Sequence, residues 1–291
     1  MPIGDDKGGF IKPGYSPLTI IGQTAYTSPG SYSFVVPATS TSISVVAVGA
    51  GGTSSNSVWS GGAYGSGGGG LGWTNGISVT PGEVLDVVVG SNTGGMPSNG
   101  GDSYVQRSAS DLIRANGGVG AQSSGTGGSY TAEGGGDGGD GAYSSAGSGA
   151  GYGGGGGGAG GYAGDGGNGG ANSAGGTGSG GAGGGGGSSH GSNGGRGGGG
   201  GGVGILGQGS NGGSGAQGPS YGAACPQYNA GSGGENGNVG SPCNKQGGDY
   251  GGGAGGDGGT NYGGTACQGG SGAVRIIYGD DRSFPSDAGD V

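Results

Sequence analysis

Uninterrupted runs of glycine are the feature that most restricts how this chain can fold. The longest pure runs are Gly153–Gly158, Gly183–Gly187 and Gly197–Gly202, and 100 of the 291 residues are glycine. Glycine offers no side chain to bury, and it loses more backbone freedom on folding than any other residue. Order in the region 117–270 must therefore come from backbone interactions, or be absent.

The composition of this region suggests three structures. A collagen triple helix needs a strict Gly-X-Y repeat with abundant proline. Between 117 and 270 only Pro219, Pro226 and Pro242 occur, so collagen is excluded. A flexible linker is typical of such a composition. A bundle of polyglycine II helices is the third structure, in which left-handed three-residue turns pair their backbone groups with those of neighbouring helices. The residues alone leave disorder and the bundle as equal alternatives.

The bundle predicts where each kind of glycine segment should lie. Helices surrounded by others need glycine at every position, because only glycine lets backbones approach closely on all sides. Helices at the periphery can carry a polar residue at every third position. Gly164–Gly170, which reads Gly-Asp-Gly-Gly-Asn-Gly-Gly, and Gly255–Gly259 follow this second pattern. We therefore expect the pure runs inside and these segments outside.

Strand-like patterns lie on both sides of the glycine-rich region. Residues 42–47 alternate with a period of two, which is typical of a half-buried strand. A hairpin is expected around Thr80–Gly82, and one or two strands are expected at 103–115. The apolar segment 273–278 would be unstable alone, so we expect it to join the N-terminal sheet. No sustained helical pattern occurs, so no α-helix is predicted.

Composition excludes several classes of function. The formal net charge is −9 and only 9% of residues are charged, so nucleic-acid binding is not expected. No run approaches the roughly 20 apolar residues of a membrane-spanning helix, so no membrane insertion is expected. The first ten residues contain no apolar run behind a basic stretch, so we expect no secretory signal peptide.

Catalysis and cofactor binding are poorly supported. The glutamates Glu83, Glu133 and Glu235 are scattered in turns without the spacing of a catalytic carboxylate pair. We therefore predict that the chain is not an enzyme and has no cofactor. The single histidine and three cysteines lack the spacing of a zinc site, and no metal is expected. Asp137 and Asp140 could bind calcium, but the favoured interpretation is that they are solvated carboxylates in turns.

The cysteines are Cys225, Cys243 and Cys267. Cys225 and Cys243 flank a loop and could form one disulfide, which would leave Cys267 over. An odd count argues against a disulfide framework, so free thiols are the favoured interpretation.

Two stretches are candidates for contact with a partner. The stretch 221–245 is the part of the region least dominated by glycine, and 53–66 contains two aromatic residues. Tyrosine and asparagine suit carbohydrate or protein contacts, since they combine flat apolar faces with adaptable hydrogen bonding. A long turn packed on a neighbouring subunit, and aromatics that cap the sheet, are the structural alternatives. The candidate residues are Tyr221, Tyr228, Asn229, Asn236, Asn238 and Lys245 in the first stretch, and Trp59 and Tyr64 in the second.

Several segments resemble the glycine-rich domain of bacteriophage tail fibres. They are SYSFVVPATSTSISVVAVGAGG (31–52), GGGGLGWTNGISVTPGEVLDVVVG (67–90), GGGVGILGQGSNG (200–212) and the ending GGSGAVRIIYGDDRSFPSDAGDV (269–291). The last two are similar in particular to proteins of marine phages. The resemblance covers the chain from about residue 20 to its end, and it brings no enzymatic motif with it.

The resemblance implies a non-catalytic structural protein of the virion, made in the host cytoplasm and carried on the extracellular particle. Some tail-tip adhesins of this wider group carry polyglycine II bundles and contact receptors through loops at one end. The expected partners are a host surface glycan or outer-membrane protein, and other virion proteins through the N-terminal arm. The resemblance is compatible with two assemblies, a homotrimer or a single chain. A purely architectural role, as a decoration, collar or fibre-connector protein, and an ice-binding protein are the alternatives.

With this resemblance, the predicted fold is all-β plus polyglycine II, without α-helix. It consists of a small antiparallel β-sandwich-like domain with an inserted bundle of PPII (polyglycine II) helices. The predicted parts are an extended N-terminal docking arm at 1–17, a β-domain at 18–116 completed by the strand 273–279, the bundle at 117–272 and a C-terminal tail at 280–291.

Overall fold

All regular secondary structure in the described part of the chain is β-strand. The computed structural model describes residues 21–54, 63–92, 97–121, 125–144, 151–191, 195, 197–217, 246–256, 267–279 and 282–285. No α-helix occurs among these residues, and so none that could cross a membrane. The prediction of an all-β chain without α-helix is therefore confirmed for the residues described.

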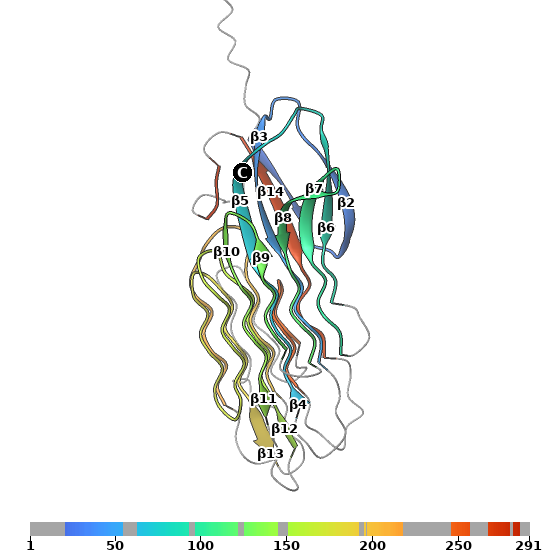
Figure 1. Ribbon diagram of the computed structural model, residues 1–291. Helices are drawn as coiled ribbons and strands as arrows, with labels where there is room; N and C mark the ends of the chain where they lie inside the picture. Colours follow the sequence, from blue (N-terminus) through green and yellow to red (C-terminus); the bar gives the residue numbers. More distant parts are fainter. Residues whose placement is uncertain are drawn as a thin grey trace, which may run out of the picture.

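Two five-stranded antiparallel sheets share one hydrophobic core at one end of the molecule (Figure 1). The first sheet has the order β1-β14-β3-β5-β10 and the second β2-β6-β7-β8-β9. The strands of the first sheet are β1 (Gly22–Tyr26), β14 (Ala273–Tyr278), β3 (Ser42–Val48), β5 (Leu71–Ser78) and β10 (Gly134–Gly136). Those of the second are β2 (Gly30–Val35), β6 (Val84–Val89), β7 (Ser103–Arg107), β8 (Ser110–Ala115) and β9 (Tyr130–Thr131).

Side chains that alternate along the strands fill this core. In β6, Leu85 and Val87 are buried against the other sheet, whereas Val84 and Asp86, which alternate with them, are exposed. This is the period of two that the pleat imposes. Full burial of one such aliphatic side chain contributes about 1.5–3 kcal/mol, so the core is the main source of stability in this part.

Strand β3 is covered on both faces, which differs from the half-buried strand that its alternation predicts. Ile43 and Val45 point into the core between the sheets, while Val46 and Val48 enter a second apolar cluster on the opposite face. This cluster is supplied by distant segments. Its other buried members are Leu71, Ala159, Tyr162, Val203, Ile205, Ala273, Ile277 and Phe284.

Phe284 and Tyr162 hold the second cluster against the first sheet. Their rings stack with centroids 5.9 Å apart, and the indole Nε1 of Trp73 donates to the Tyr162 carbonyl at 2.8 Å. Asn75 of β5 also exchanges two hydrogen bonds with the backbone of Phe284, at 2.7 and 2.8 Å. The C-terminal segment 282–285 therefore fastens the glycine-rich part to the sheet.

The turn at Thr80–Gly82 connects two sheets and does not close a hairpin. Strand β5 pairs with β3 and β10, and β6 pairs with β2 and β7, so the expected hairpin is wrong. Alternation shows which face of a strand is buried, but it does not identify the strand beside it. The segment expected at 103–115 does form a hairpin, β7–β8.

Strand β14 lies between β1 and β3, where the sequence predicts that the apolar segment returns. Glycine-rich residues are not confined to the predicted insertion at 117–272. The segments 49–54, 65–70 and 98–101 already hydrogen-bond to later glycine segments. The glycine-rich part is therefore interleaved with the sheets, because individual strands continue directly into glycine segments.

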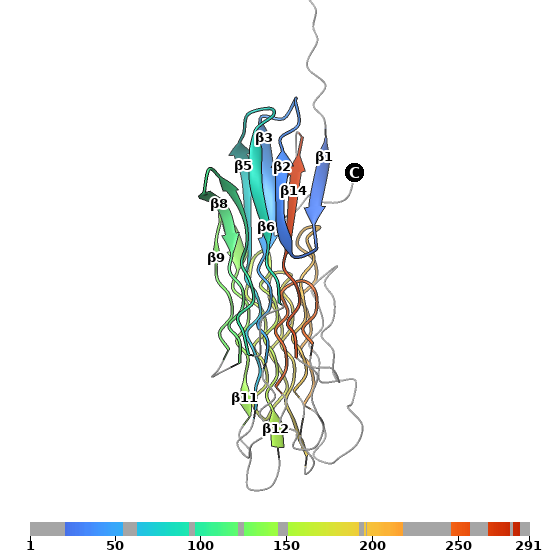
Figure 2. The same cartoon turned by 90° about the vertical axis from the view of Figure 1, so that its right-hand side faces the viewer.

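The glycine segments run side by side along the long axis of the molecule, as Figure 2 shows. At the end far from the two large sheets, a small sheet has the order β11-β4-β12-β13 (Figure 1). We call this end the tip. The strands of the small sheet are β11 (Tyr143–Ser144), β4 (Ala63–Tyr64), β12 (Gly151–Gly153) and β13 (Ser189–Gly191).

Candidate functional site

Hydrogen bonds of the glycine segments repeat every third residue. In 65–70, the N–H groups of Gly65 and Gly68 donate to one neighbouring segment, those of Ser66 and Gly69 to a second, and those of Gly67 and Gly70 to a third. These accepting segments are 139–142, 251–254 and 116–119, in that order. Each turn of the backbone therefore points its N–H groups in three directions, all of them toward other segments.

Residues 154–160 repeat this pattern. The N–H groups of Gly154, Gly157 and Gly160 donate to Ala63, Ser66 and Gly69, so this segment runs parallel to its neighbour. The N–H groups at the other two positions of each turn donate to segments 167–170 and 198–201. Neighbouring segments can thus run parallel or antiparallel to each other, and the hydrogen bonds repeat every third residue in both cases.

Backbone proximity explains why these segments are glycine. A Cβ atom added to Gly155, Gly156 or Gly157 would overlap a backbone carbonyl oxygen of Gly186, Gly253 or Gly139, respectively. A side chain is therefore excluded at all three positions of the turn, because the carbonyl groups cannot move without losing the hydrogen bonds that they accept. The prediction that pure glycine runs lie inside is confirmed, since 153–158, 183–187 and 197–202 are buried.

Exposed side chains occupy every third position of the outer segments. Asp137, Asp140 and Tyr143 are exposed on one segment, and Asp165 and Asn168 on the next, with buried glycines between. The expected Gly-Gly-X periphery is therefore confirmed for 164–170.

Side chains of this outer row accept backbone N–H groups of the adjacent segment. The N–H groups of Asp137 and Asp140 donate to Oδ1 of Asp165 and Asn168 at 2.9 and 2.8 Å. Oδ1 of Asp140 in turn accepts from the N–H of Gly127 at 2.8 Å. The side chains thus complete hydrogen bonding at the boundary of the glycine-rich part, where backbone carbonyls no longer surround each segment.

Two tyrosines meet where this outer row reaches the tip. Tyr143 follows Asp140 by three residues, and its ring stacks on Tyr64 of β4 with centroids 4.4 Å apart and an interplanar angle of 26°. Tyr143 is 37% exposed, and Tyr64 is half-buried. We call this pair the tip tyrosines.

Paired strands determine where the tip tyrosines lie. Tyr64 leads through 65–70 into β5, while Tyr143 is reached from β10 through 137–142, and β5 pairs with β10. The two intervening segments hydrogen-bond to each other through Gly65–Ala142 and Gly68–Gly139. The register set in the large sheet is therefore kept all the way to the tip.

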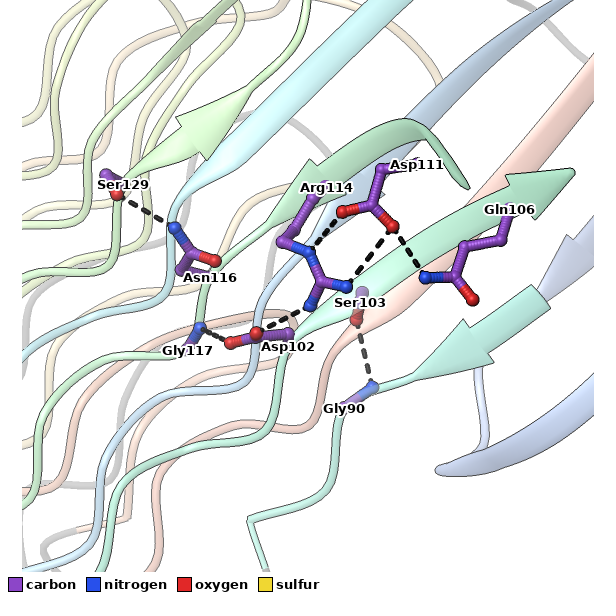
Figure 3. A network of polar contacts seen from close by, with 9 residues as sticks. All are labelled: Gly90, Asp102, Ser103, Gln106, Asp111, Arg114, Asn116, Gly117 and Ser129. Carbon is purple, nitrogen blue, oxygen red and sulfur yellow. Dashed lines mark hydrogen bonds and ion pairs between the residues drawn. The ribbon is translucent and has the colours of Figure 1, made fainter. Parts of the chain in front are cut away.

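A polar network lies where the second sheet changes into glycine segments (Figure 3). The Arg114 guanidinium donates to Asp111 at 2.7 Å and to Asp102 at 2.8 Å, and it lies 4.1 Å above the ring of Tyr104. Asp102 also accepts the N–H of Gly117 at 3.0 Å. The hydrogen bond from Arg114 lowers the pKa of the Asp111 carboxyl. The network therefore supplies an acceptor for the N–H of Gly117, at the point where strand β8 has ended and a glycine segment begins.

No family model matches this chain, and no curated protein matches it. Among the described residues, no group of His, Cys, Asp and Glu has the arrangement of a metal site.

Only one of the contact residues predicted from the sequence, Tyr64, lies in the described part of the chain, and the structure brings it to Tyr143. Tyr143 was missed as a candidate, although its position three residues after Asp140 marks it as exposed. Cys267 is buried, and its carbonyl accepts the N–H of Ser54. The candidates outside the described residues are Trp59, Tyr221, Tyr228, Asn229, Asn236, Asn238 and Lys245, together with the proposed disulfide Cys225–Cys243.

Proposed function

We propose that this chain is a non-catalytic structural protein of a bacteriophage tail fibre or tail tip that mediates attachment to the host cell surface. In this proposal the two large sheets form a β-sandwich at the particle end. The glycine segments form a bundle of polyglycine II helices that carries a contact surface outward. A host glycan or outer-membrane protein would meet the tip, and the N-terminal arm at 1–17 would join other virion proteins.

The hydrogen-bond pattern supports polyglycine II helices. Such a helix has three residues per turn and no internal hydrogen bonds, so its backbone groups must pair with neighbours. Residues 65–70 and 154–160 donate with this period, and every acceptor lies in another segment. The overlaps that an added Cβ would produce support the same packing.

Exposure of Tyr143 at the tip is the observation that carries the attachment function. Most aromatic side chains that the structure describes are packed against apolar neighbours, as Tyr162 and Phe284 are. Tyr143, which is exposed and stacks on the half-buried Tyr64, lies at the end of the glycine segments instead. Exposed aromatics are enriched in recognition surfaces, because they combine a large apolar face with a polar group.

Competition for adsorption tests this function. Purified full-length chain added in excess should reduce adsorption of phage particles that carry it, and replacement of 221–245 by a Gly/Ser stretch of equal length should weaken the competition. Labelled antibodies against the chain should bind at the distal end of the tail or fibre. Unchanged adsorption at saturating protein, together with label on the shell or collar, would favour the purely architectural role.

A further inference from the structure

We infer that the tip tyrosines form a subsite for a neutral saccharide ring. This inference rests on the proposed attachment function and specifies the chemical class that the tip binds. It concerns Tyr64 and Tyr143 only, and it is independent of the stretch 221–245.

The ring geometry suits a sugar. A pyranose has one face of C–H groups and a rim of hydroxyl groups, so it loses little hydrogen bonding when that face covers an aromatic ring. Tyr143 presents such a ring at the surface, and the stack with Tyr64 holds its orientation, with centroids 4.4 Å apart. A platform that is already rigid costs little conformational entropy when a ligand binds.

Two amide residues, Asn172 and Gln217, are linked by hydrogen bonds to each other and to Ser144, the residue that follows Tyr143 at the tip. The N–H of Asn172 donates to Oγ of Ser144, the residue after Tyr143, at 3.2 Å, and Nε2 of Gln217 donates to the Asn172 carbonyl at 2.8 Å. Both amide residues are exposed. Asn172 also has a positive φ of 55°, which holds the chain in a turn at this point. Amide side chains of this kind can donate to and accept from hydroxyl groups at a sugar rim.

Charge selects a neutral ligand. Asp137 and Asp140 precede Tyr143 in the same exposed row, and Asp165 lies on the adjacent segment. The whole chain carries a formal net charge of −9. An anionic saccharide would approach against this field, whereas a neutral one meets no such barrier.

Binding to polysaccharides of different charge tests this inference. Full-length protein is applied to immobilised dextran, mannan, galactan and starch as neutral probes, and to alginate and polygalacturonate as anionic probes. At least one neutral probe should be retained and neither anionic probe. Tyr143→Ser should weaken the retained interaction about tenfold or more, since the apolar contact area is lost.

Two further variants separate binding from folding. Tyr143→Phe keeps the ring and should stay within about threefold of the unmodified affinity, because stacking requires the face and not the hydroxyl. Val84→Ser, at an exposed position of β6 in the large sheets, should leave binding unchanged. Unchanged affinity of Tyr143→Ser, retention of anionic probes alone, or no retention of any neutral probe would overturn the inference.

These outcomes are distinct from failure of the attachment function. Protein that competes for adsorption but retains no neutral probe leaves attachment intact and points to a protein receptor. Protein that retains a neutral probe through Tyr143 but does not compete for adsorption supports the subsite and contradicts its role in attachment.

Discussion

The two parts of the molecule satisfy their backbone groups in similar ways but hold their segments together differently. In the sheets, strands pair edge to edge, and side chains such as Leu85 and Val87 hold the layers together. In the glycine-rich part, inner segments such as 65–70 and 154–160 pair in three directions, and almost no side chain lies between them and their neighbours. Ordering a residue costs about 1–2 kcal/mol of backbone entropy, and a hydrogen bond returns about 0.5–1.5 kcal/mol.

That difference makes the glycine-rich part dependent on the sheets. Its hydrogen bonds do not clearly exceed the entropy cost, and it has little apolar surface to bury. The second apolar cluster, in which Tyr162 and Phe284 cover β3, supplies an anchor between the parts. The comparison also predicts opposite responses to mutation. Removing side-chain atoms should harm the sheets, and adding them should harm the glycine segments.

Removal of core atoms from the sheets should have the largest effect. Leu85→Ala takes away a fully buried side chain and should lower the free energy of unfolding by about 2–5 kcal/mol, since it removes apolar contacts and leaves a cavity. Chemical denaturation followed by tryptophan fluorescence measures this change. Val84→Ala, one residue away and 57% exposed, is the control and should change stability by less than about 0.5 kcal/mol.

Addition of one methyl group should destabilise the glycine segments. Gly157→Ala places a Cβ against the carbonyl of Gly139 and should cost about 1–3 kcal/mol by overpacking. Gly176→Ala is the matched control and should cost less, because its added Cβ would lie 3.1 Å from the Asn168 nitrogen, and a small shift of that neighbour would relieve the contact. Thermal unfolding of the two variants compares them directly. Equal melting temperatures would contradict a close-packed interior.

Loss of an accepting side chain at the outer row should have a smaller effect. Asn168→Ala removes the acceptor of the Asp140 N–H and should cost about 0.5–1.5 kcal/mol, because water can replace part of the interaction. Hydrogen exchange should show faster exchange at the Asp140 amide. Thr177→Ala, at another exposed position of the outer segments, should leave that amide unchanged.

The ion pair at the junction should have the smallest effect, and one that depends on pH. The pKa of Asp111 is lowered in the folded state by its hydrogen bond to Arg114. The pair therefore stabilises the fold above the unfolded pKa of about 3.9, and this contribution is lost as pH falls through the lower folded value.

Asp111→Asn tests this pH dependence. The variant should lose about 1 kcal/mol or less at pH 7, because the pair is partly solvated. The difference from the unmodified protein should disappear in strongly acidic solution. Urea titrations at several pH values measure it, and a difference that persists below pH 2, or is absent at pH 7, would show that the ion pair does not contribute.

The sequence predicts local features better than partnerships. Apolar and alternating patterns located β3, β5–β8 and β14 but not the short strands β9–β13, and the spacing of Asp165 and Asn168 correctly predicted an exposed row. It could not show that β5 pairs with β10 and not with β6, because both arrangements bury the same face. It also could not show that 65–70 lies among later glycine segments. Backbone hydrogen bonds are the same for every glycine, so they leave no record in the residue types. The meeting of Tyr64 with Tyr143 depends on those pairings.

Continuity between strands and glycine segments also has a mechanical consequence. A pull on the tip passes along 65–70 into β5 and along 137–142 into β10, parallel to the segments. The hydrogen bonds that join the segments lie across this direction, so tension loads many of them in shear at once. Failure then requires several bonds to break together, whereas peeling would break them one after another. The same architecture that displaces the tip from the sheets would thus also distribute a force applied to the tip.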